Sequence, residues 1–277
     1  MRLNGRYRKR KAPYPLFDQT QQTMYKKIIS ISFCLVLMPC LISAQQDTDR
    51  RQAIGLTLLV NHVKPLIIQK NFASTEANIT SNSIPGFEGR LDYRFRIKNG
   101  LYFEGGLLFG LNPYRFDLFV SEDFADLPWG DHNDYYQVYE DNLYLGAALS
   151  LSYSFPVGNK SDIAAGIGVN YIYYIGFGSS SYGVSYSIDP NTQISVFSMT
   201  TSSNPEQVLI FPVEFRIRYN YLIGKRMLFS ATLTWVPSDK SILTGNYTIL
   251  GTDRSLPGTI DKRSGRAGLG IGGYYLF

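Results

Sequence analysis

The sequence is poor in cysteine, histidine and charge. Its 277 residues include two Cys and two His, and Asp, Glu, Lys and Arg together make up 18%. Both cysteines, Cys34 and Cys40, lie in one apolar stretch near the N terminus. A disulfide scaffold and a thiolate metal site are therefore excluded for the rest of the chain. The sequence is instead rich in Tyr (21), Phe (17) and Gly (25), a balance that favours strands over helix bundles or disorder.

Residues 24–44 have the organisation of a secretory signal peptide: a short cationic start, an apolar run and a small-residue exit. The apolar run is shorter than the roughly 20 residues that a membrane-spanning helix needs, so a retained anchor is the weaker interpretation. We expect cleavage between Ala44 and Gln45. Lipid attachment at Cys40 is an alternative that Pro39, directly before it, disfavours.

Residues 1–23 precede this signal and are rich in Lys and Arg. Because a signal peptide acts from the true N terminus, we interpret 1–23 as a non-native extension and expect translation to start at Met24. Removing 1–44 takes away 8 of 27 basic and 1 of 22 acidic residues, which leaves 19 against 21 and a net charge of about −2 instead of +5. The basic balance that would favour nucleic acid as a partner is thereby lost, and we expect none.

The remaining chain, 45–277, alternates apolar with small or polar residues, which is the period of a strand with two different faces. In 86–98, for example, Phe87, Leu91 and Tyr93 fall on one face, whereas charged residues, among them Glu88, fall on the other. The pattern predicts eight strands, over 52–63, 86–98, 101–111, 142–155, 162–176, 207–222, 227–236 and 265–277.

The connections between these segments alternate in length. Three are tight turns, at 98–100, 156–161 and 223–226, and four are long, at 64–85, 112–141, 177–206 and 237–264. Short turns on one side and long external loops on the other are typical of outer-membrane barrels. We therefore predict an all-β fold, a transmembrane antiparallel up-and-down β-barrel of eight strands with four long external loops. Strand-like stretches at 194–197 and 247–250 are interpreted as extensions above the membrane, with ten strands as the alternative.

The apolar face of the predicted strands carries no charge, so lipid is its natural solvent. Aromatic residues lie towards both ends of these strands, as in the two girdles of membrane barrels. The sequence also ends in Tyr275-Leu276-Phe277. In these features 50–277 resembles the small outer-membrane β-barrel domain family, including OmpA-like barrels and the PorT-like group of Bacteroidota. The resemblance implies outer-membrane localisation, lipid contact, and an assembly signal at Tyr275 and Phe277 that the barrel-assembly machinery recognises.

The inward face of the predicted barrel is strongly charged. An eight-stranded barrel is just wide enough for side chains to fill, and arginine–carboxylate pairs satisfy charges that are removed from water. We therefore expect a structural ionic cluster, with a narrow passive pore as the alternative because Arg exceeds acid. The expected members are Arg90, Asp92, Arg94, Arg96, Glu104, Glu214, Arg216, Arg218 and Arg266.

The connection 112–141 is acidic and rich in aromatic residues. Aromatic side chains are common anchors of protein interfaces, so a protein partner in the cell envelope is one hypothesis. A merely solvated loop and a calcium site are the others, although the acidic spacing fits no EF-hand. The candidate anchors are Phe119, Phe124, Trp129, Tyr135 and Tyr136.

No catalytic, cofactor or metal-binding motif stands out in the sequence. The two histidines, His62 and His132, do not by themselves form a catalytic constellation, which geometry defines. We therefore expect a non-enzymatic structural or binding module that acts through its external loops, in surface recognition, adhesion or an envelope assembly. A narrow pore is the alternative, and a lipid-modifying enzyme is third.

Overall fold

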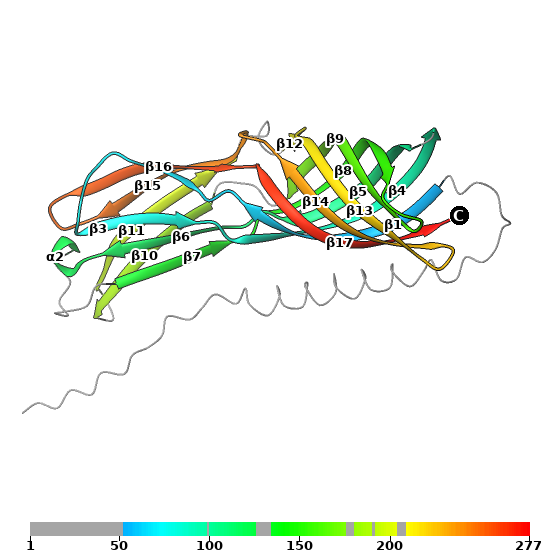
Figure 1. Ribbon diagram of the computed structural model, residues 1–277. Coiled ribbons are helices and arrows are strands. Elements are labelled where there is room, and N and C mark those ends of the chain that lie inside the picture. The colour runs from blue at the N-terminus through cyan, green and yellow to red at the C-terminus, as the bar shows by residue number, and fades with distance from the viewer. Residues whose placement is uncertain (1–51, 99, 126–133, 176–179, 190–191, 204–208) are drawn as a thin grey trace, which may run out of the picture. The chain divides into compact units, whose positions relative to one another are not determined.

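The computed structural model describes residues 52–98, 100–125, 134–175, 180–189, 192–203 and 209–277 (Figure 1). The expected N-terminal extension, signal peptide and cleavage site at Ala44 and Gln45 lie outside these residues. From Thr48 onward the chain forms one compact unit.

Eight antiparallel strands close into a barrel. Around the barrel they follow the order β1-β4-β5-β8-β9-β13-β14-β17, and pairing of β17 with β1 completes the circle (Figure 1). The strands are β1 (Gln52–Val63), β4 (Pro85–Lys98), β5 (Leu101–Leu111), β8 (Leu143–Pro156), β9 (Ser161–Ile175), β13 (Val213–Ile223), β14 (Met227–Val236) and β17 (Arg266–Leu276). The predicted fold class and strand number are confirmed.

One predicted strand is interrupted. Residues 207–222 give a short strand, β12 (Leu209–Ile210), and then β13, and both pair with β9 in one continuous register. The break falls at Phe211 and Pro212, because proline has no backbone N–H to donate to the ladder. The Pro212 carbonyl still accepts a hydrogen bond from the backbone N–H of Asn170, at 3.0 Å.

The outer surface of the barrel is apolar. Exposed side chains include Leu107, Leu149, Ile167 and Leu269. Aromatic side chains are exposed near both strand ends, for example Phe95 and Phe155 close to the short turns, and Tyr173, Phe211 and Trp235 at the other end. A closed barrel leaves no strand edge in lipid, where unpaired backbone groups would cost several kcal/mol each. The protein is a transmembrane β-barrel of the outer membrane.

The described parts of the four long connections are regular rather than irregular, and strands extend well beyond the stretches 194–197 and 247–250. The connections fold into β2 (Ile67–Lys70), β3 (Ala77–Asn82), β6 (Tyr114–Val120), β7 (Asp134–Glu140), β10 (Ser180–Asp189), β11 (Thr192–Ser202), β15 (Ser241–Leu250) and β16 (Ser255–Arg263), with a short helix α2 (Glu122–Ala125). We call this part the β-extension. It lies beyond the end of the barrel that is opposite to the short turns and the C terminus (Figure 1). Because short turns mark the periplasmic side of outer-membrane barrels, we expect the β-extension to lie on the external side.

The β-extension continues the barrel wall in the same circular order but opens it at two seams. Strands β10-β11-β15-β16-β2 form one sheet and β3-β6-β7 another. No backbone pairing joins β2 to β3 or β7 to β10 among the described residues. Two separate sheets, unlike a closed ring, can pack face to face.

The space between the two sheets holds a hydrophobic core. Phe116 of one sheet contacts Phe197 of the other, with ring centroids 5.7 Å apart. Other members are fully or nearly fully buried: Ala77, Ile79, Leu118, Val120, Phe124, Val196, Met199, Leu243, Tyr247, Ile249 and Ile260. The strands of the β-extension form because alternate residues reach this core while the others face water.

Glycines inside the barrel make room for large side chains. A Cβ atom at Gly110 would lie 2.5 Å from the Tyr144 hydroxyl oxygen and 2.6 Å from the Phe87 carbonyl oxygen. We expect Gly110→Ala to displace Tyr144 and to lower the free energy of unfolding by about 1–3 kcal/mol, measured by urea unfolding in detergent. Gly273→Ala is the control, because nothing lies within 4 Å of its added Cβ. Equal stability of the two variants would contradict the argument.

Candidate functional site

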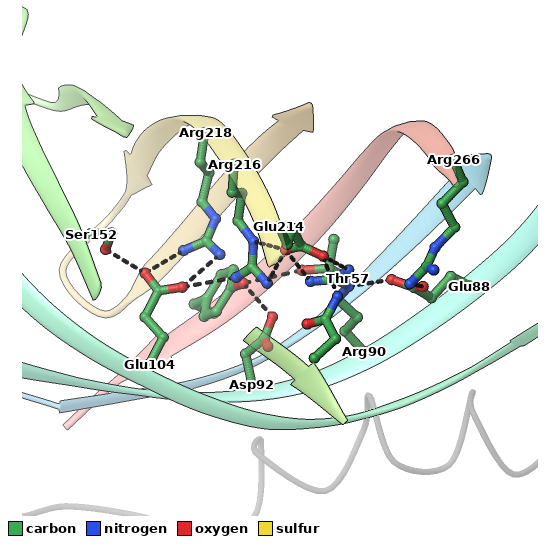
Figure 2. A network of polar contacts seen from close by, with 12 residues as sticks. Thr57, Glu88, Arg90, Asp92, Glu104, Ser152, Glu214, Arg216, Arg218 and Arg266 are labelled. Atoms are coloured by element: carbon green, nitrogen blue, oxygen red, sulfur yellow. Dashed lines mark hydrogen bonds and ion pairs between the residues drawn. The ribbon is translucent and has the colours of Figure 1, made fainter. Parts of the chain in front are cut away.

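The lumen of the barrel contains a network of buried charges (Figure 2). The structure places eight of the nine predicted cluster residues there, at 6% exposure or less: Arg90, Asp92, Arg94, Glu104, Glu214, Arg216, Arg218 and Arg266. Arg96 is half-buried near a short turn. Glu88 is a further member that the sequence interpretation placed on the charged face but left out of the cluster.

Glu88 and Glu214 organise the half of the network nearest the β-extension. Glu88 accepts hydrogen bonds from Arg90, from Tyr144 and, at 2.9 Å, from Arg266. Glu214 accepts a bidentate pair from Arg90, of which the bond to Oε1 is 2.7 Å long. Planar guanidinium and carboxylate groups in this arrangement fix each other's orientation as well as neutralising charge.

Glu104 organises the other half. Both of its oxygens accept hydrogen bonds from Arg218 at 3.0 Å, and Arg216 donates to Oε2 at 2.9 Å. Ser152 donates at 2.8 Å, and Arg94 forms an ion pair at 3.2 Å. Arg216 also bonds to Glu214, at 2.9 Å, and so links the two halves (Figure 2). One carboxylate thus serves three guanidinium groups.

Aromatic side chains complete the network. Three guanidinium groups lie over rings: Arg94 over Tyr102 at 4.0 Å, Arg218 over Tyr274 at 5.0 Å, and Arg266 over Tyr144 at 5.2 Å. The buried charges of the barrel among the described residues are five arginines against four carboxylates. Cation–π contacts compensate for part of that small excess. The arrangement neutralises charge and fills space.

An apolar layer follows the network on the side of the β-extension. Its members are buried: Leu108, Tyr144, Ala148, Ile172, Tyr174, Ile210 and Ile242. The hydrophobic core of the β-extension comes next. Within the described residues, ion pairs therefore fill the inside of the barrel, and apolar side chains together with the buried Lys262 fill the interior beyond it.

Lys262 of β16 is a buried cation of the β-extension, and its ammonium group donates a hydrogen bond to the Lys64 carbonyl. Desolvation lowers the pKa of Lys262 to about 7. From about pH 7 to about pH 10.5 the unfolded chain therefore holds a proton that the folded chain has released, so stability rises with pH across that range and is lowest at and below pH 7.

We expect Lys262→Met to raise the free energy of unfolding by about 3 kcal/mol at pH 7, with the gain shrinking towards pH 10. Urea unfolding at several pH values measures this difference. Lys240→Met, at an exposed side chain, is the control and should change little. A gain that does not vary with pH would show that Lys262 titrates normally.

The predicted partner anchors fall in different environments. Phe124 is 4% exposed in the core of the β-extension, so its assignment as an interface anchor is wrong. The short helix α2 turns it inward. Tyr136 packs against the same core, and Phe119 is half-buried on the opposite face of the sheet. Trp129 and the side chain of Tyr135 lie outside what the structure describes.

The two residues of the predicted assembly signal lie together at the end of β17. The rings of Tyr275 and Phe277 stack with centroids 6.5 Å apart, and Arg226 donates a hydrogen bond to the Tyr275 hydroxyl at 3.0 Å. Phe277 is exposed. Tyr275 is half-buried, so of the two rings only that of Phe277 is fully accessible.

Of the two histidines, His62 is exposed and lies 3.2 Å from the hydroxyl of Ser83, which donates to the Val63 carbonyl. His132 lies outside the described residues. Within the described ranges, no group of three or more metal-ligating side chains gathers. No helix of the described part is long and apolar enough to cross a membrane.

No protein-family model and no curated protein matches the chain. Among solved structures it is similar to the outer membrane protein OprG from Pseudomonas aeruginosa, with a TM-score of 0.43 and 15% identity over 84% of this chain and 99% of that one. Neisserial surface protein A gives a TM-score of 0.38 and 10% identity over 82% and 97% of the two chains. The outer membrane protease OmpT from Escherichia coli gives 0.38 and 8% over 85% and 99%. The barrel assignment rests on this chain's own strand pairing.

Proposed function

We propose that the protein is a non-enzymatic recognition module of the outer membrane, in which the barrel is the anchor and the β-extension is the binding part. The observation that carries this proposal is the filled interior. Ion pairs occupy the barrel lumen, and the β-extension has a core of its own. A rigid surface binds a ligand more tightly than a flexible one, because little conformational entropy of the protein is lost on binding.

Solute passage is the competing function, and conductance tests it. We expect the purified chain to give no stepwise current in planar lipid bilayers. Glu214→Ala removes the carboxylate that Arg90 and Arg216 share. Of the lumen variants, it is the one in which ion leakage would first appear. Stepwise current from the unaltered protein would replace recognition by passive transport as its function.

A crosslinking pull-down from native outer membranes tests the recognition function. Retention of a protein or surface polymer by the unaltered chain, and its loss when the β-extension is disrupted, is the expected result. A stoichiometric envelope protein would support a narrower function, a subunit of a secretion assembly, which the resemblance to the PorT-like group suggests. Lipid A that changes in mass when the gene is deleted would favour an enzyme instead.

A further inference from the structure

The outward side of the three-stranded sheet differs from the rest of the β-extension. Residues that alternate with the core members on β3, β6 and β7 face away from the core. The rows that cross all three strands in register include Asn82–Arg115–Tyr139 and Thr80–Asp117–Gln137. We call these residues, together with Phe119, the β6 face: Thr80, Asn82, Arg115, Asp117, Phe119, Gln137 and Tyr139.

The centre of the β6 face is a preformed polar group. Asp117 accepts a hydrogen bond from Arg115 at 3.0 Å and another from the Asn82 amide at 3.2 Å. The guanidinium and the carboxylate neutralise each other but keep further donors and acceptors in fixed planes. The strand that carries them is anchored by Phe116 and Leu118, which are fully buried on the other side.

Aromatic rings stand at the two ends of this polar centre. Tyr139 is 55% exposed and pairs with Arg115 across the strands. Phe119 lies four residues further along β6, a separation of about 13 Å. A ligand that reaches both rings must therefore be extended, must offer two apolar faces, and must offer polar groups between them.

We propose that the β6 face binds a neutral saccharide chain of two or three sugar units. Pyranose rings present C–H faces that stack on aromatic rings, and adjacent hydroxyls that pair with planar amide, carboxylate and guanidinium groups. The internal ion pair gives the centre no net charge, which suits a neutral ligand. This inference rests on the proposed recognition function and names its ligand class.

The size of the β6 face favours a saccharide over a protein. Three strands spaced about 4.8 Å apart and about 13 Å of strand length cover about 190 Å². A stable protein interface buries about 800 Å² on each partner. A short oligosaccharide needs no larger surface, provided that the surface is rigid and its polar groups are already oriented.

The other sheet supplies a matched comparison. Its outward side carries hydroxyl and amide side chains such as Ser198, Thr200 and Asn246, of which Thr200 and Asn246 pair across β11 and β15. Ser198, Thr200 and Asn246 can form hydrogen bonds to water or to sugar hydroxyls, but they offer no aromatic ring on which a sugar could stack. Comparing the two faces therefore separates a built site from general polarity.

The full chain in lipid nanodiscs is tested against an immobilised panel of glucose, galactose, mannose and N-acetylglucosamine oligosaccharides. We expect binding to at least one of them. Tyr139→Ala should weaken that binding by tenfold or more, Tyr139→Phe should retain it because the ring remains, and Asp117→Asn should weaken it. Thr200→Ala is the matched control and should not change it. Unaltered protease resistance shows that each variant is folded.

Absence of binding to every oligosaccharide, or binding that Tyr139→Ala leaves unchanged, overturns the proposal. A photo-crosslinker in place of Gln137 distinguishes failure of the saccharide proposal from failure of the proposed recognition function. Capture of a protein at that position in native membranes would reject the saccharide but keep recognition. Stepwise conductance of the unaltered chain, with neither kind of binding, would reject both.

Discussion

Replacement of Glu104 by leucine is expected to lower the free energy of unfolding of the barrel by about 3–5 kcal/mol. Glu104 is the carboxylate that Arg94, Arg216 and Arg218 share, and it is 2% exposed. Removing it leaves buried guanidinium groups without their counter-charge, and this costs more than the original pair contributes. Urea unfolding in detergent, followed by the shift between folded and unfolded bands on unheated gels, measures the loss.

The matched control is Glu76, which pairs with Arg254 on the exposed surface of the β-extension. Glu76→Leu should change the free energy of unfolding by no more than about 1 kcal/mol, because solvent screens both charges. If Glu104→Leu behaved like this control, the guanidinium groups would have to be hydrated. A hydrated lumen would bring back the pore as the function of the barrel.

The barrel was predictable because its two faces meet different solvents. Lipid excludes charge from one face, and the narrow lumen admits polar groups on the other, so strict alternation persists over whole strands. β1, β5 and β14 begin and end where the sequence pattern does. The break before β13 is the exception, and Pro212, visible in the sequence, is its cause.

The β-extension was much harder to predict because one side of each sheet faces water. Polar residues around single apolar ones, as in Asn78-Ile79-Thr80, look like a loop until Ile79 is seen in the core. The stretches 194–197 and 247–250 gave a correct signal, since both belong to β-strands of the β-extension. The two seams could not be predicted, because a missing backbone pairing between neighbouring strands does not change the residue pattern of either strand.

The ionic cluster shows the same limit at the level of side chains. Alternation places Arg90 and Glu214 on an inward face, but they are 124 residues apart and their pairing depends on strand tilt and stagger around the barrel. Glu88 belongs to the cluster because Arg266, 178 residues away, reaches it from the last strand. Membership of the face could be predicted, and the choice of partner could not.

Replacement of Phe197 by alanine is expected to unfold the β-extension while the barrel stays closed. Phe197 is fully buried, and its ring lies 5.7 Å from that of Phe116 and 6.3 Å from that of Tyr247. Phe→Ala in a core costs about 3–5 kcal/mol. This small core holds together two sheets between which the described residues form no backbone pairing. Limited trypsin digestion of intact cells should then cut at Arg115 or Lys262, which lie within β6 and β16 in the folded protein.

The barrel supplies the control, because Leu233 faces lipid and is 51% exposed. Leu233→Ala should keep the β-extension resistant to trypsin, and both variants should still run as folded barrels on unheated gels. Cleavage limited to Phe197→Ala would show that the β-extension folds on its own core and that the barrel serves as its anchor. If Phe197→Ala stayed resistant to trypsin, the β-extension would not depend on its hydrophobic core. Its stability would then come from backbone hydrogen bonds that continue from the membrane strands into the hairpins of the β-extension.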